Sequence, residues 1–317
     1  MPDAPAAPSK TQTFLRRKSD IITGIVTPAA PSKTQTFLRR TFSTLLLWGV
    51  VGAAFGSMKP WAHLTLIGFL ALWAMVEFCS LSRLSGIAVH RFWAMTLSAG
   101  YGAAVSYFLW HGQAVPAELD IALLFLLVCG TLIGQLRQPI DGVKSVLAVT
   151  STIFGVLWLT WLFYFTARLD FAPRFDGSMP GAYVLLWCLA VTKFTDMGAY
   201  ITGSLIGKHK MIPHISPAKT WEGFAGALLF ALIAAGGLYA LFPTQLAIFP
   251  SWLHVIGLSQ IVALLAVVGD LAESLWKRSL AVKDSGHALP GIGGAMDLID
   301  SLCFTAPAVY LYVVLFL

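Results

Sequence analysis

Long apolar runs separated by short polar segments dominate the chain after about residue 40. Most of these runs have about the twenty residues that an α-helix needs to cross a hydrocarbon core of about 30 Å. They predict an all-α fold, namely a polytopic helical membrane protein with about nine transmembrane helices. We place the expected spans, of which the first is the shortest, at 43–58, 61–82, 92–110, 119–136, 145–167, 181–201, 224–242, 251–272 and 299–317.

Lysine and arginine are distributed unevenly between the expected loops. Most of the 21 such residues lie in the N-terminal tail and in segments 83–91, 135–144, 202–223 and 273–298. The exceptions are Lys59, Arg168, Arg174 and Lys193, the last of which lies inside the sixth expected span. Because cytoplasmic loops carry the excess of positive charge, the tail and the loops 202–223 and 273–298 are predicted to face the cytoplasm.

Composition agrees with a membrane protein. Hydrophobic residues make up 57% of the 317 residues and charged residues 11%, whereas soluble domains carry about a quarter charged residues. This excludes an ordinary water-soluble surface. The four cysteines have no disulfide-framework spacing and are interpreted as packing residues.

The N-terminal tail is basic and contains a duplication, because residues 5–17 recur as residues 28–40. Its Pro, Ala, Ser and Thr content predicts disorder. Either the duplication has no function, or its basic residues rest on anionic lipid headgroups. We divide the chain into this cytoplasmic tail (1–42), a set of N-terminal transmembrane helices (43–180) and a C-terminal transmembrane catalytic region (181–317).

A first polar region runs from residue 193 to residue 223. Charged side chains inside a membrane are costly and are functional candidates. Lysines, hydroxyls and glycines near a membrane face suit phosphate oxygens, although Lys208 and Lys210 are alternatively topology anchors. Residues 216–222 are predicted to form a turn and the start of the next helix. The candidate substrate-binding residues here are Asp196, Tyr200, Lys208, Ser216, Lys219, Thr220 and Glu222.

A second polar region runs from residue 269 to residue 301. Asp270, Glu273 and Lys277 are spaced to share one helix face. Carboxylates beside lysines are typical of a Mg²⁺–polyphosphate site, and internal salt bridges are the alternative. The candidates here are Asp270, Glu273, Lys277, Arg278, Lys283, Asp284, Gly293, Gly294, Asp297 and Asp300. Glu77, in the second span, either pairs with a basic residue of the C-terminal half or lines a lipid cleft.

These two regions resemble the phosphatidate cytidylyltransferases, also called CDP-diacylglycerol synthases, over about a third of the chain. The resemblance rests on Asp196 to Lys208, Ser216 to Gly223, Ser274-Leu-Trp-Lys277-Arg278, Lys283-Asp284, Pro290-Gly291-Ile292-Gly293-Gly294 and Asp297-Leu298-Ile299-Asp300. The sequence departs from the family pattern at Ile292 and Leu298, where His and Arg are usual.

The resemblance implies transfer of CMP from CTP to phosphatidate, with CDP-diacylglycerol and pyrophosphate as products. It implies Mg²⁺ as cofactor, with a second cation left open, and Asp270, Asp297 and Asp300 as metal ligands. The implied catalytic set is Asp270, Lys277, Lys283, Asp284, Asp297 and Asp300. We expect the bacterial inner membrane, a cytoplasmic active site, the lipid bilayer as surroundings and no nucleic acid; a homodimer is left open.

Other functions stay open at this point. One is another CTP-dependent lipid cytidylyltransferase or a lipid kinase, which product analysis with defined lipids would distinguish. A second is a secondary transporter that uses Asp196 and Asp270 for coupling ions, although no related halves are visible. A third is an inactive scaffold, which the departures at Ile292 and Leu298 keep open.

Overall fold

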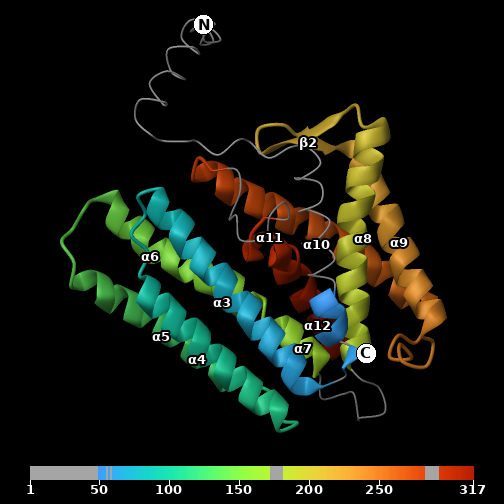
Figure 1. The fold of residues 1–317 in the computed structure, drawn as a ribbon, viewed down its shortest axis with the longest axis horizontal. Helices are drawn as coiled ribbons and strands as arrows, with labels where there is room; N and C mark the ends of the chain where they lie inside the picture. The colour runs from blue at the N-terminus through green and yellow to red at the C-terminus, as the bar shows by residue number, and fades with distance from the viewer. Residues whose placement is uncertain (1–48, 55, 58, 172–180, 283–292) are drawn as a thin grey trace, which may run out of the picture.

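The computed structural model describes residues 49–54, 56–57, 59–171, 181–282 and 293–317. Eleven helical segments and one short hairpin make up the fold of these residues (Figure 1). The elements are α3 (Pro60–Leu84), α4 (Arg91–Trp110), α5 (Ala117–Leu136), α6 (Val143–Val156), the π-helix η1 (Leu157–Leu162), α7 (Phe165–Asp170), α8 (Gly181–Ile206), β1 (Lys210–Ile212), β2 (Ser216–Thr220), α9 (Trp221–Leu241), α10 (Trp252–Ser279), α11 (Ala295–Ile299) and α12 (Leu302–Phe316).

The prediction of an all-helical membrane protein is confirmed. Among the described residues, seven helical stretches are long and apolar enough to cross a bilayer. They are Pro60–Leu84, Ala117–Leu136, Val143–Asp170, Gly181–Ile206, Trp221–Leu241, Trp252–Ser279 and Ala295–Phe316. Helix α4 coincides with the expected third span but is not one of the seven, and most of the expected first span lies outside the described residues, as do residues 1–42.

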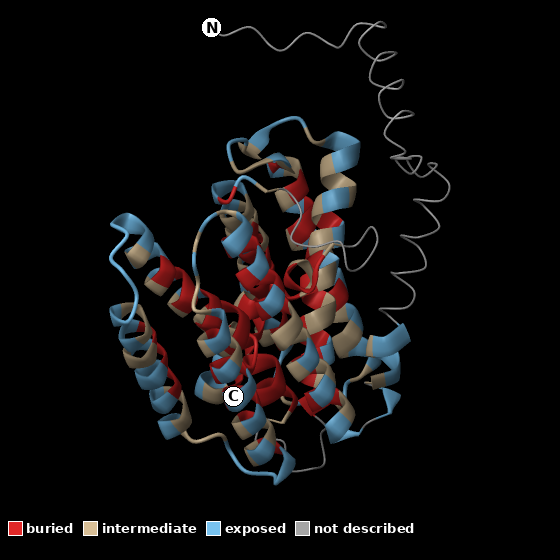
Figure 2. Cartoon of the chain, turned by 60° about the vertical axis from the view of Figure 1, so that its left-hand side comes forward, coloured by how far each residue is buried: buried red, intermediate tan, exposed pale blue. Residues whose placement is uncertain are grey.

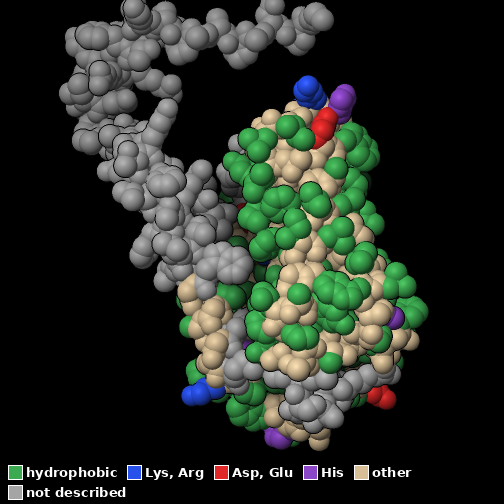
Figure 3. Space-filling model, turned by 90° about the vertical axis from the view of Figure 1, so that its right-hand side faces the viewer, with side chains coloured by type: hydrophobic (Ala, Val, Ile, Leu, Met, Phe, Trp, Pro, Cys, Tyr) green, Lys and Arg blue, Asp and Glu red, His purple; other side chains and the backbone are tan. Residues whose placement is uncertain are grey.

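Surface chemistry requires a lipid environment. The apolar helix α5 has a mean hydropathy of 2.1, yet only 17% of that stretch is buried inside the protein. Exposed apolar area on this scale is not tolerated in water. Figure 3 shows one face of the molecule on which hydrophobic side chains cover the middle and charged side chains lie towards the two ends. The chain is therefore an integral membrane protein.

Two hydrophobic cores organise the helices, and buried residues run through both of them (Figure 2). The first core joins α3, α4, α5, η1 and α11, with Phe78 and Met296 among its fully buried side chains. The second joins α8, α9, α10 and the later part of α12, with Trp187 at its centre. Helix α11 thus belongs to the N-terminal core, whereas the rest of the last span reaches into the C-terminal core.

Helix α7 corrects the expected end of the fifth span. Arg168 was predicted to lie in a loop, but it is buried within the helix. Its Nη2 donates to Asp120 Oδ1 at 2.6 Å and to the Tyr101 hydroxyl at 2.8 Å. This internal ion pair allows the charged residue to stay within the helical bundle, because a buried charge needs a partner.

Helices α8 and α9 lie against each other, with the hairpin β1–β2 joining their ends (Figure 1). The close approach depends on glycine: a Cβ on Gly226 would overlap the Thr202 side chain, and one on Gly198 would lie 2.6 Å from the Gly226 carbonyl oxygen. The predicted turn at Ser216 is wrong, since β2 begins there and pairs antiparallel with β1. The predicted start of the next helix at Thr220 is confirmed, because its Oγ1 accepts from Gly223 N.

Candidate functional site

Helix α10 carries three charged residues of the site. Asp270, Glu273 and Lys277 lie on one helix, as their spacing predicts, and Lys277 Nζ is 2.8 Å from Glu273 Oε2. Gly269 lets the last span come close, since a Cβ there would lie 2.8 Å from Ser301 Cα and 3.0 Å from the Asp300 carbonyl oxygen. This contact sets Asp300 beside the carboxylates of α10.

Three carboxylates gather where α10 meets the last span. One oxygen each from Asp270, Glu273 and Asp300 lies within 4.8 Å of the others. Glu273 and Asp300 are buried, and no hydrogen-bond partner is found for Glu273 Oε1 among the described residues. Three clustered carboxylates repel one another, so the arrangement could hold a metal ion, and their hard oxygen atoms fit Mg²⁺.

Asp297 lies beside this cluster and shares Lys277 with Glu273. Its Oδ1 is 2.9 Å from Lys277 Nζ, and its Oδ2 accepts from Gly294 N at 2.9 Å. A Cβ on Gly293, whose φ is +112°, would overlap Asp297 Oδ2. Asp297 is therefore held by its own turn and by α10. The acids that the structure groups are Asp270, Glu273 and Asp300, and the role of Asp297 as a metal ligand stays a prediction.

The first polar region meets the second through a lysine of the hairpin. Lys219 Nζ lies 2.8 Å from Asp270 Oδ2 and donates to the Val267 carbonyl at 3.4 Å. Both regions line one cavity of about 480 Å³. Its lining includes the predicted substrate-binding residues Asp196, Tyr200, Ser216, Lys219 and Thr220, together with the predicted metal ligand Asp270.

Glu222 organises the hairpin. Its Oε2 accepts from the backbone N of Lys208 at 3.1 Å and of His209 at 3.2 Å, and its Oε1 contacts His209 Nδ1 at 2.5 Å. The carboxylate thereby holds the start of the hairpin against α9. Its contacts within the described residues are those of a positioning residue, and its predicted contact with substrate stays a prediction.

The other predicted residues are placed as follows. Lys208 and Arg278 are exposed, Arg278 near the end of α10, and neither lines the 480 Å³ cavity. Lys283 and Asp284 lie outside the described residues, as do Pro290, Gly291 and Ile292.

Glu77 joins the N-terminal half to the site, and its pairing with a basic residue and its place in a lipid cleft both stay predictions. The buried carboxylate accepts from the backbone N of Met296 at 3.0 Å. A Cβ on Gly294 would overlap Glu77 Oε2, so this glycine makes room for the contact. The sequence signal was a carboxylate inside an apolar span, but its partner is a backbone amide 219 residues away.

Lys193 is a residue to which sequence reasoning assigned no role. It lies on α8 with Nζ 3.7 Å from Asp196 Oδ2 and 3.4 Å from the Leu298 carbonyl oxygen. A lysine inside an apolar span was the available signal. Its two contacts place it between the polar cavity and the last span.

The fold and the site define an integral membrane protein whose polar cavity combines carboxylates and lysines, a makeup suited to phosphate groups and metal ions. A model of the family described as "Cytidylyltransferase family" matches residues 38–316. The chain therefore belongs to the cytidylyltransferase family.

Individual relatives agree with this membership. The chain is 32% identical over 278 residues to YnbB, an uncharacterized protein of Escherichia coli K12. This match covers 84% of each of the two chains. It is 34% identical over 188 residues to a phosphatidate cytidylyltransferase of Staphylococcus saprophyticus, covering 59% of this chain and 65% of that one. It is 32% identical over 196 residues to a phosphatidate cytidylyltransferase of Staphylococcus aureus, covering 62% and 68%.

Proposed function

We propose that this protein transfers CMP from CTP to phosphatidate and releases pyrophosphate, with CDP-diacylglycerol as the lipid product. The observation that carries the proposal is the cluster of Asp270, Glu273 and Asp300 beside Lys219 and Lys277 in a membrane protein of the cytidylyltransferase family. Similarity to phosphatidate cytidylyltransferases of two Staphylococcus species supports phosphatidate as the acceptor.

The reaction needs alignment more than an activated side chain. The phosphate monoester of phosphatidate has a second pKa near 6 and is already a nucleophile at neutral pH. One of its oxygens forms a bond to the α-phosphorus of CTP, the bond from that phosphorus to the bridging oxygen of the β-phosphate breaks, and pyrophosphate leaves with the electron pair. The protein's part is to hold the two phosphates in line and to stabilise the negative charge that moves to the leaving group.

The described residues divide these tasks. Lys219 lines the polar cavity and would bind the phosphates of CTP there. Lys277, between Glu273 and Asp297, keeps part of the carboxylate charge neutral. Asp270, Glu273 and Asp300 would hold Mg²⁺, which when bound neutralises polyphosphate charge. The site belongs to the proposed catalytic region 181–317 and, by the lysine and arginine distribution, faces the cytoplasm of a bacterial inner membrane.

A labelled-nucleotide assay tests the proposal. Purified protein in detergent receives CTP labelled at the α-phosphorus together with phosphatidate and Mg²⁺, and label is followed into the chloroform phase. We expect a chloroform-soluble nucleotide that depends on phosphatidate and is not formed with diacylglycerol or an isoprenoid alcohol. In a parallel reaction with CTP labelled at the γ-phosphorus, transfer of that label to the lipid would identify a lipid kinase. Another accepted lipid phosphate would identify a cytidylyltransferase of different specificity. Label that stays in the aqueous phase with every lipid would contradict the proposal.

A further inference from the structure

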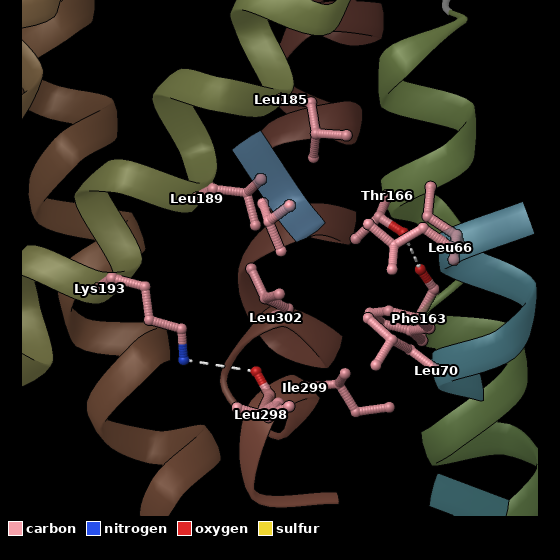
Figure 4. Close-up of a pocket in the computed structure, with 12 residues that line it drawn as sticks. Leu66, Leu70, Phe163, Thr166, Leu185, Leu189, Lys193, Leu298, Ile299 and Leu302 are labelled. Atoms are coloured by element: carbon pink, nitrogen blue, oxygen red, sulfur yellow. Dashed lines mark hydrogen bonds between the residues drawn. The ribbon is translucent and has the colours of Figure 1, made fainter. Parts of the chain in front are cut away.

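An apolar cavity of about 110 Å³ lies between α3, α8 and the last span (Figure 4). Its lining is almost wholly apolar and includes Leu70, Leu189, Leu298 and Leu302. Among all its lining residues the single charged side chain is that of Lys193. A cavity with this lining offers water too few polar partners, whereas a hydrocarbon chain needs none.

Lys193 lies where the apolar cavity meets the polar one. It lines the apolar cavity, and its Nζ is 3.7 Å from Asp196 Oδ2, whose residue lines the polar cavity. Figure 4 shows the ammonium pointing to the Leu298 carbonyl oxygen, at 3.4 Å. The Lys193 side chain remains 28% exposed and the Asp196 side chain 38% exposed, so the pair is open to a further ligand.

Lys193 supplies the positive charge next to the backbone of residue 298. The Leu298 side chain lines the apolar cavity and is itself uncharged. The cation next to this backbone comes instead from α8, through Lys193. A phosphate monoester with its hydrocarbon tail in the apolar cavity would have this ammonium as the one charged side chain among the cavity's lining residues.

We propose that Lys193 binds the phosphate of the lipid substrate and that the apolar cavity takes the first part of one of its acyl chains. The proposal rests on the proposed function and adds to it a subsite for the acceptor. An amphipathic ligand with an anionic head and a hydrocarbon tail matches a lysine at the side of a leucine-lined cavity in both charge and polarity. CTP, which has no hydrocarbon tail, does not match this subsite.

The first test separates the two substrates kinetically. Lys193→Met removes the charge and keeps the length of the side chain, and Lys193→Arg restores a cation. We expect Lys193→Met to raise the KM for phosphatidate at least about tenfold, the loss of one charge-assisted hydrogen bond, with the KM for CTP unchanged. Lys193→Arg should recover most of this loss. If Lys193→Met leaves the KM for phosphatidate unchanged, or raises the KM for CTP instead, the assignment is wrong.

The second test fills the cavity. Leu189→Phe narrows it, and Leu186→Phe is the matched control, because Leu186 lies on the same helix, is 37% exposed and does not line the cavity. We expect Leu189→Phe to raise the KM for dioleoyl phosphatidate several-fold more than that for dibutyroyl phosphatidate, and Leu186→Phe to raise neither. Equal effects of the two variants would show that the cavity is a packing void.

A binding measurement keeps the subsite separate from the overall reaction. Native mass spectrometry without CTP compares phosphatidate with phosphatidylcholine on the wild-type protein and on Lys193→Met. We expect selective phosphatidate binding that Lys193→Met reduces about tenfold. If the wild-type protein makes no CDP-diacylglycerol but shows this selectivity, the proposed function fails and the lipid subsite stands. Equal phosphatidate binding by the two proteins would overturn the subsite.

Discussion

Replacing Asp300 by asparagine distinguishes a metal site from a set of structural ion pairs. Asparagine keeps the shape and the oxygen that accepts from Ser301 N at 2.6 Å, but it removes one charge from the group of three acids. Ionised carboxylates whose oxygens lie within 4.8 Å of one another repel, so charge on this cluster is unfavourable where no cation balances it. The variant therefore loses repulsion in the metal-free protein and loses a ligand in the metal-bound protein.

The loss of repulsion raises the unfolding temperature of the variant, whereas the loss of a metal ligand lowers it in the presence of Mg²⁺. In EDTA we expect Asp300→Asn to unfold at the same temperature as the wild-type protein or at a higher one. In Mg²⁺ the wild-type protein should gain more in unfolding temperature than the variant, because binding to the native state stabilises it. Transfer of CMP should fall by at least about 10²-fold, as for loss of one electrostatic stabiliser, and more Mg²⁺ should be required.

The matched control is Asp141→Asn. Asp141 lies 3.3 Å from Lys144 at the surface, and both side chains are 70% exposed. Exposed pairs of this kind contribute little to stability, so the control should leave activity, Mg²⁺ dependence and unfolding temperature unchanged. If Asp300→Asn unfolds well below the wild-type protein in EDTA and retains its activity and Mg²⁺ dependence, Asp300 is a structural residue.

Three further outcomes are expected. Lys219→Met should lower kcat/KM for CTP by about 10²-fold in the labelled-nucleotide assay, since a cation at the cavity wall is lost; an unchanged value would remove Lys219 from the CTP site. Glu77→Ala leaves the Met296 amide without its acceptor and should destabilise the protein by about 1–3 kcal/mol in thermal unfolding, whereas Glu77→Gln should recover part of this loss; equal unfolding temperatures for Glu77→Ala and the wild-type protein would refute the contact. A chain that starts at residue 41 should keep most of its specific activity in detergent; loss of activity in a folded truncated chain would assign the tail a role.

The helices were largely predictable because hydropathy and length decide which segments cross a membrane. The same reasoning ended the spans too early at charged residues. Helix α10 continues to Ser279, because Lys277 finds Glu273 and Asp297 inside the protein. Helix α7 likewise continues past Arg168, because Asp120 neutralises it. Hydropathy counts a charge as exposed to water, and it contains no information about a partner on another helix.

The site was predictable in its residue types but not in their grouping. Asp297 and Asp300, three residues apart, were expected to face the same ion. In the structure Asp300 lies in the cluster at the junction between α11 and α12, whereas Asp297 meets the cluster through Lys277, which it shares with Glu273. Glu273 takes the third place in the acidic cluster. The close approach at Gly269 depends on how two spans pack, which spacing along one chain does not encode.

The contact between Glu77 and Met296 has a consequence for recombination between relatives. A chimera that joins the first half of one relative to the second half of another places α3 and α11 from different parents at the same seam. Such a hybrid has to keep an acidic residue at position 77 together with glycine at position 294, because each is shaped to the other. The two sides of the seam therefore constrain each other in such a hybrid, and the N-terminal helices are more than an exchangeable membrane anchor.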